Sequence, residues 1–106
     1  MSNNQRSITS LGQTVGKVYV YLPDVDLGNL FLRKAEAEGF TFADGAKPTQ
    51  RPYSQVMAVN SNNTINYVGS NGMIAFGTNA DRIGKRNLIR VDFRKYMCGS
   101  EDYTYD

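Results

Sequence analysis

The 106-residue chain contains no histidine and no tryptophan, and its single cysteine is Cys98. Histidine performs most biological proton transfer near neutral pH and is the commonest transition-metal ligand. A zinc site needs several Cys and His ligands at close spacing, and one cysteine cannot form an internal disulfide. The composition therefore argues against a zinc site and a histidine-based active site, and the lone thiol fits a reducing compartment.

Long apolar runs are missing as well. No stretch approaches the roughly 18 consecutive apolar residues of a membrane-spanning helix, and residues 1–10 lack the apolar core of a secretion signal. Hydrophobic residues make up 41% of the chain and charged residues 21%, which is typical of a globular domain. We therefore expect one domain in the cytoplasm, of a bacterium or of a host that a virus has entered.

Charge is unevenly placed along the chain, although the net charge is only +2. Residues 52–80 carry no charged side chain, and the charged residues of 82–95 are mostly basic. The basic members of this segment are Arg82, Lys85, Arg86, Arg90, Arg94 and Lys95. A run of like charges is usually a solvated face. The segment is therefore either such a face, partly neutralised by the acidic tail, or a site that meets an anionic partner.

Hydrophobic periodicity and turn residues predict several strands. Val18, Val20 and Leu22 alternate with Tyr19 and Tyr21, which is typical of a half-buried strand. The predicted strands cover residues 17–22, 40–43, 55–60, 64–68, 73–76 and 88–93. Short turns rich in Asn and Gly separate the middle strands, and such turns make neighbouring strands antiparallel.

One helix is predicted, over residues 26–38. Asp24 or Asp26 can cap its start, because a short carboxylate accepts the free backbone N–H groups there. Apolar residues follow at helical spacing, and Gly39 supplies the left-handed residue that commonly closes a helix. The apolar face of this helix must pack on a sheet.

These elements predict an α+β fold in the order β-α-β-β-β-β-β. We expect a two-layer domain, with one main helix packed on a mostly antiparallel, twisted sheet of about five to six strands. Residues 1–16 are predicted to be a flexible N-terminal arm, residues 17–98 the domain and residues 99–106 an acidic C-terminal tail. With a single helix, the second face of the sheet has no cover. The residues then expected to face solvent or a partner are Tyr19, Tyr21, Asn66 and Arg90.

The sequence gives little support for a catalytic, metal-binding or phosphate-binding site. Asp24 and Asp26 are close in sequence, but helix capping explains them better than magnesium binding does. Cys98 has no histidine to act as its base. Residues 69–72 (GSNG) place glycines after a strand, but a dinucleotide loop must open a helix. Because residues 73–76 are predicted to be a strand, the hairpin interpretation is preferred.

Two binding hypotheses remain, besides an enzyme or small-molecule sensor with an unrecognised pocket. In the first, the basic segment meets phosphates and exposed Tyr19 and Tyr21 stack on bases. In the second, the uncharged residues 52–80 lie beside the basic edge and form a protein interface, where aromatic residues and Arg are enriched and acids are depleted. Both hypotheses make the two tyrosines and the six basic residues of 82–95 the candidate binding residues.

Three runs of the chain resemble small uncharacterised accessory proteins of bacterial prophages and conjugative elements. They are residues 31–45 (FLRKAEAEGFTFADG), residues 64–69 (TINYVG) and residues 89–96 (IRVDFRKY). The resemblance covers roughly residues 17–98 and implies a protein that acts by binding, with no catalytic residue. Some proteins of this kind are anti-CRISPR inhibitors, which occupy the nucleic-acid or guide-binding surface of a host nuclease. The basic segment is unlike the strongly acidic, DNA-mimicking inhibitors.

From the residues and the resemblance together, we expect a non-enzymatic phage or mobile-element protein without metal or cofactor. Its expected partner is a host or defence protein, such as a nuclease, which it inhibits or modulates in the bacterial cytoplasm. The alternative is a small nucleic-acid-binding accessory protein that uses the basic segment at 82–95. Neither hypothesis involves a membrane.

Overall fold

The computed structural model describes residues 6–13, 16–78, 82–83 and 86–105. The elements are α1 (Ile8–Gly12), β1 (Lys17–Tyr21), α2 (Val25–Ala37), β2 (Thr41–Phe42), the 3₁₀ helix η1 (Pro48–Gln50), β3 (Val56–Val59), β4 (Thr64–Tyr67), α3 (Ser70–Gly77), β5 (Arg82–Ile83), β6 (Arg86–Asp92) and α4 (Phe93–Met97). The predicted α+β class is confirmed. Among the described residues, no helix has the length and apolar content that crossing a bilayer requires.

The strands form an open mixed sheet in the order β2-β4-β3-β1-β6-β5. β3 pairs antiparallel with β4, as the short turn between them predicts. It also pairs antiparallel with β1. The central β1–β6 pair and the β2–β4 pair are parallel, so the predicted mostly antiparallel sheet is wrong. Short turns fix the direction of hairpin partners only, and these two pairs join strands that are distant in sequence. The two-residue β5 adds an antiparallel pair on the outer edge of β6.

Helix α2 forms where its periodicity and cap residues predict it. The Asp24 side chain accepts a hydrogen bond from the Leu27 amide at 2.9 Å, so Asp24 is the N-cap. Gly39 follows the helix with φ of 89°, a conformation that costs glycine little. Phe31 and Ala35 are fully buried against the sheet. The Asp24 carboxylate also pairs with Arg94 on α4, so the start of α2 is joined to the C-terminal part of the domain.

The main core lies between the sheet and three helices, and it includes α1. Ile8 and Leu11 of α1 are buried beside Phe31 of α2 and Phe93 of α4. This finding corrects the predicted boundary at residue 16, because α1 packs as part of the domain. Residues 1–5 and 14–15 of the predicted arm lie outside the described residues.

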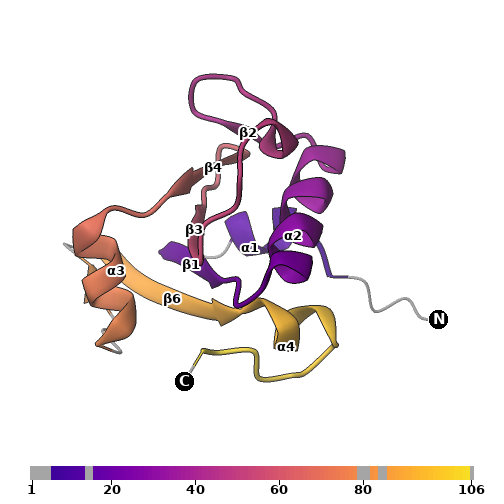
Figure 1. Ribbon diagram of the computed structural model, residues 1–106. Coiled ribbons are helices and arrows are strands. Elements are labelled where there is room, and N and C mark those ends of the chain that lie inside the picture. The colour runs from indigo at the N-terminus through magenta and orange to yellow at the C-terminus, as the bar shows by residue number, and fades with distance from the viewer. Residues whose placement is uncertain (1–5, 14–15, 79–81, 84–85, 106) are drawn as a thin grey trace.

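Helix α3 covers part of the second face of the sheet, where the sequence predicts a strand at 73–76 and no cover. Figure 1 shows α1 and α2 on one side of the sheet and α3 on the other. Phe76 of α3 is buried with Tyr19 and Leu88 in a second apolar cluster. The N-cap residue Gly69 makes no side-chain hydrogen bond, so no capping signal marks the start of α3. Helix α3 begins at Ser70, so residues 70–72 form its first turn. The predicted hairpin is therefore wrong, although the glycine pattern of a dinucleotide loop remains incomplete.

The C-terminal tail lies along the outer edge of β6. The Tyr105 amide donates to the Arg90 carbonyl at 2.9 Å, and the Asp92 amide donates to the Tyr103 carbonyl at 2.7 Å. Thr104 forms a bridge with Val91 between these two bonds. The described part of the tail therefore supplies partners to an edge strand that would otherwise expose its backbone.

The two ends of the described chain meet around Tyr96. The Arg6 guanidinium lies over the rings of Tyr96 and Tyr103, at 5.3 and 5.0 Å from the ring centroids. The Tyr96 hydroxyl donates to the Ser7 carbonyl at 2.7 Å. Burial of this hydroxyl raises the pKa of Tyr96 to about 12, so it remains a donor at every physiological pH.

Candidate functional site

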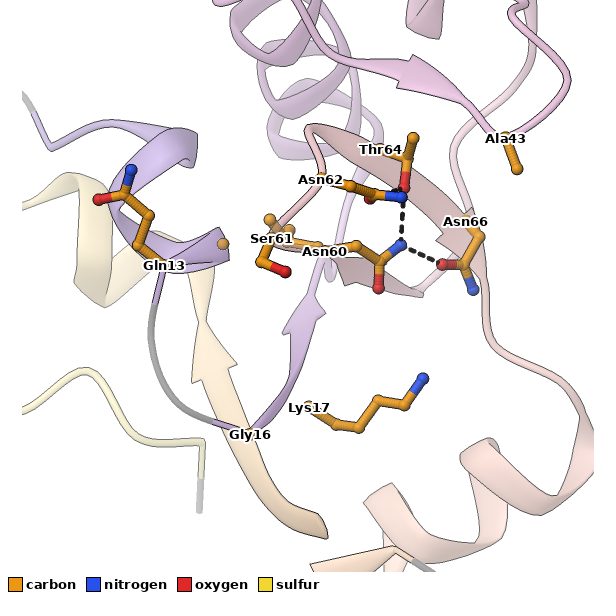
Figure 2. Close-up of a pocket in the computed structure, with 11 residues that line it drawn as sticks. Gln13, Gly16, Lys17, Ala43, Asn60, Ser61, Asn62, Thr64 and Asn66 are labelled. Carbon is orange, nitrogen blue, oxygen red and sulfur yellow. Dashed lines mark hydrogen bonds between the residues drawn. The ribbon is translucent and has the colours of Figure 1, made fainter.

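A polar cavity of about 660 Å³ lies beside the start of β1 and the turn between β3 and β4 (Figure 2). Its volume is within the range of sites for small ligands. The polar side chains around it are Gln13, Lys17, Asn60, Ser61, Asn62, Thr64 and Asn66. Most ligand pockets have mainly apolar walls, so this cavity suits a polar or charged group.

The asparagines of the cavity are held in one hydrogen-bonded network. Asn60 Nδ2 donates to Asn66 Oδ1 at 2.7 Å and to Thr64 Oγ1 at 3.1 Å. The Thr64 hydroxyl donates to Asn62 Oδ1 at 2.6 Å, and Asn66 Nδ2 donates to the Tyr67 carbonyl at 2.9 Å. Figure 2 shows Asn60 joined to Thr64 and Asn66 along one side of the cavity. The network orients the amides before any ligand arrives.

The turn between β3 and β4 brings these side chains together. Asn60 follows β3 and pairs with Thr64, because the Asn60 amide donates to the Thr64 carbonyl at 2.9 Å. Asn63 adopts φ of 63° in the turn, which asparagine tolerates better than most residues. Asn66 lies opposite Ala58 on the face of the sheet that also carries Tyr19. Pairing register therefore sets the geometry of the amide cluster.

Lys17 is the one charged residue among those that line the cavity. It is the first residue of β1, on the same face as Tyr19, and it is half-buried. Figure 2 shows its side chain extending through the cavity below Asn60 and Asn66. Its ammonium forms no hydrogen bond or ion pair within the described part of the chain, so its charge is available to a ligand.

An apolar surface on α3 lies on the same side of the sheet. The exposed fractions are 63% for Ile74 and 37% for Met73. Gly72 of the same helix packs against the Tyr19 ring. Tyr19 and Lys17 point to the same face of β1, so α3 and Lys17 lie on one side of the sheet. Ile74 and Met73 belong to the uncharged residues 52–80. We call these two side chains, together with the polar cavity on the same side of the sheet, the α3 surface.

The two candidate tyrosines are covered, which corrects the expectation that they face solvent or a partner. Tyr19 is 6% exposed, and burial raises the pKa of its hydroxyl. Tyr21 is half-buried, with its ring centroid 4.5 Å from that of Tyr105 and 5.9 Å from that of Phe76. Helix α3 and the tail occupy the face that base stacking would need.

The described basic side chains of residues 82–95 have internal partners. Arg90 Nη1 donates to the Tyr105 carbonyl at 3.0 Å, and Lys95 Nζ lies 3.5 Å from the Thr104 carbonyl. Arg94 Nη2 pairs with Asp24 at 2.6 Å. Exposed Arg82 donates to Asn87 Oδ1 at 3.3 Å. Each of these four side chains therefore connects two segments of the fold.

The two other basic candidates cannot be placed in the same way. Lys85 lies outside the described residues, and Arg86 is described only as the first residue of β6. Metal binding is no better supported, since the described residues contain no group of three His, Cys, Asp or Glu that could hold an ion. Cys98 is a free, exposed thiol after α4.

Sequence reasoning missed Lys17, Asn60, Ile74 and Met73. A signal for Lys17 was present, because the alternation that places Tyr19 on one face of β1 places Lys17 there too. Comparisons of the chain with protein-family models, curated proteins and solved structures find no match. Its function is therefore inferred from its own geometry.

Proposed function

We propose that this chain is a non-enzymatic binding protein that docks on a partner protein through the α3 surface. The observation that carries the proposal is the exposure of Ile74 and Met73 on a helix within a segment free of charge. Protein interfaces commonly combine an apolar centre with a rim of hydrogen-bonding groups, and charged residues are depleted at that centre. Ile74 and Met73 supply the apolar centre, and the amides of the cavity supply the hydrogen-bonding rim.

We further propose that the partner is a host or defence protein in the cytoplasm of a bacterial cell, such as a nuclease. This part of the proposal draws on the resemblance of three sequence runs to accessory proteins of mobile elements. Some proteins of this kind inhibit a host nuclease by occupying its nucleic-acid or guide-binding surface. Binding alone is enough for inhibition when it covers a working surface of the partner.

The chemistry of the α3 surface supports binding rather than turnover. The polar groups that line the cavity are amides, hydroxyls and one ammonium. General acid–base catalysis is most effective when a group titrates near the working pH, and amides and hydroxyls do not. These groups instead suit the recognition of fixed donor and acceptor patterns.

Replacing Ile74 with aspartate is expected to abolish partner binding. Full burial of an isoleucine side chain contributes roughly 1.5–3 kcal/mol, so its loss weakens affinity by at least about tenfold. A buried carboxylate without a partner adds a further cost. The measurement is capture of a partner from bacterial lysate by the immobilised protein, followed by titration of the purified pair.

Val25→Asp is the matched control. Val25 is 56% exposed at the start of α2, on the opposite side of the sheet from α3. The same substitution there should leave capture unchanged. If Val25→Asp and Ile74→Asp have equal effects, or if neither weakens capture, α3 is not the docking element.

Nucleic-acid binding is the alternative function, and the same material tests it. A basic footprint gives an affinity that falls steeply as salt rises. Submicromolar binding of DNA or RNA that shows this dependence, and that Ile74→Asp leaves unchanged, would replace the proposal with a nucleic-acid-binding accessory protein. Internal partners for Arg90, Arg94 and Lys95 weigh against that outcome.

A further inference from the structure

We infer that the polar cavity binds an oxyanion, the carboxylate or phosphate group of a ligand, beside Lys17. This inference deepens the proposed function, because the cavity is the polar part of the α3 surface, but a small anion can fill it with no partner protein present. The inference draws on the charge of the lining residues, on the hydrogen-bond donors that remain available, and on the prior ordering of the amides.

The charge balance of the cavity favours an anion. Lys17 is half-buried and is the single charged residue of the lining, which contains no carboxylate. A partly buried ammonium loses hydration and regains stability from a negative group within a few ångströms. No described residue supplies such a group. A cation is disfavoured, because the same ammonium repels it.

The available donors also match an oxyanion. Each asparagine amide carries two N–H donors. Asn60 uses both of its donors on Thr64 and Asn66, which fixes the network. Asn66 uses one donor on the Tyr67 carbonyl and keeps one. Asn62 is held through its oxygen by Thr64, so both of its donors are available to a ligand. Together with the three donors of Lys17, these N–H groups are available to the oxygens of an anion.

The ordering of the amides lowers the cost of binding. Immobilising a flexible side chain costs free energy on association, and the network already holds Asn60, Asn62 and Asn66. A neutral sugar or amide would use the same donors but would leave the Lys17 charge uncompensated. An oxyanion satisfies both the charge and the donors.

Titration with inorganic phosphate and with acetate tests the inference. We would follow the side-chain amide signals of Asn62 and Asn66 by ¹H–¹⁵N NMR on the ¹⁵N-labelled full chain, at constant ionic strength set with sodium chloride. A free anion held by a few hydrogen bonds should bind with a Kd on the order of 1 mM. These signals should therefore shift in a saturable manner.

Two variants should remove this response. Lys17→Met should weaken binding at least about tenfold, because it removes the charge and keeps the length of the side chain. Asn62→Asp should weaken it similarly, because it places a carboxylate in the cavity while keeping an oxygen for Thr64. Asn62 is exposed, so this second variant tests the site even if Lys17→Met fails to fold. Lys47→Met, at an exposed lysine outside the cavity, is the matched control.

The outcomes separate the possible sources of the anion. Saturation by phosphate alone assigns a phosphate-bearing ligand, saturation by acetate alone a carboxylate-bearing one, and saturation by both a general oxyanion site. Shifts that do not saturate, or Asn66 shifts that are equal in wild type and Asn62→Asp, would overturn the inference. Loss of partner capture in Ile74→Asp with a normal anion response would show that the two sites act independently.

Discussion

Replacing Gly28 with alanine is expected to destabilise the protein, although the same change stabilises most helices. Gly28 lies inside α2, where glycine normally costs roughly 0.5–1 kcal/mol relative to alanine. Here a Cβ atom would lie 2.2 Å from Cγ of Tyr53 and within 2.5 Å of two further ring atoms. The clash is with the base of the ring, so Tyr53 cannot avoid it by moving its hydroxyl end. Either the ring or the helix must shift.

We expect Gly28→Ala to lower the free energy of unfolding by roughly 1–3 kcal/mol, the usual cost of overpacking. Urea unfolding measures this change. Gly77→Ala is the control, because Gly77 lies in α3 with open space around it and should change stability little or raise it. Removing the Tyr53 ring in the Gly28→Ala background should recover part of the loss. A Gly28→Ala protein as stable as wild type would contradict the packing described here.

Glu38→Gln should cost roughly 2–3 kcal/mol at neutral pH, because Glu38 joins α1 to α2. Its carboxylate accepts hydrogen bonds from the Ile8 amide at 3.0 Å, the Thr9 amide at 2.8 Å and the Thr9 hydroxyl at 2.8 Å. Lys34 Nζ lies 3.7 Å away, and the Glu38 side chain is only 18% exposed. Glutamine keeps one oxygen but turns an N–H donor toward an amide that also donates. One of the N-terminal N–H groups of α1 then loses its acceptor.

The loss in Glu38→Gln should depend on pH. Burial alone would raise the pKa of Glu38, but hydrogen bonds from Thr9 and Ile8, with the charge of Lys34, hold it below its ordinary value of 4.5. The unfolded state therefore binds this proton at a higher pH than the folded state does. The stabilisation is fully present above about pH 4.5 and is lost as the pH falls through the folded value.

The measurement is urea unfolding of wild type and Glu38→Gln at pH 7 and at about pH 3. The stability difference should be large at neutral pH and should shrink in acid. Glu101→Gln, at an exposed carboxylate in the tail, should track wild type at both pH values. A difference between wild type and Glu38→Gln that stays constant with pH would mean that the carboxylate charge has no part in holding α1.

The sequence predicts the parts of the fold that are set by local chemistry. Alternation around Tyr19 locates β1, and Asp24 with Gly39 brackets α2 to within one or two residues. The Asn-rich turn after Asn60 gives the β3–β4 hairpin. In each case the residues that determine the element lie inside it or next to it. Capping, turn geometry and strand alternation are all short-range effects.

Helix α3 was missed because distant residues stabilise it. Residues 69–72 are typical of a turn, and Gly69 offers no capping side chain. The helix is held by Phe76, which packs on Tyr21 and on Tyr105 at centroid distances of 5.9 and 4.6 Å. Neither tyrosine is near Phe76 in sequence, so local propensity was overridden by tertiary packing. The error carried over to Tyr19 and Tyr21, which are accessible only if α3 is absent.

The candidate site was partly predictable. Strand alternation places Asn66 on the face of Tyr19, and it places Lys17 there by the same rule. The cavity also needs the end of α1, which lies beside the β3–β4 turn, so its shape depends on how α1 docks. The docking of α1 depends on Glu38, which nothing in the local sequence pairs with Ile8 or Thr9.

The parallel pairing of β1 with β6 also constrains how the chain is made. Lys17 is opposite Leu88 in this pair, so the middle of the sheet joins an early segment to a late one. After β1 has left the ribosome, translation must continue through Asp92 before its parallel neighbour β6 is complete. Until then one side of β1 has no strand to pair with, and long-range closure of this kind slows folding. The unfinished chain therefore exposes an unpaired strand edge to chaperones and proteases for most of its synthesis.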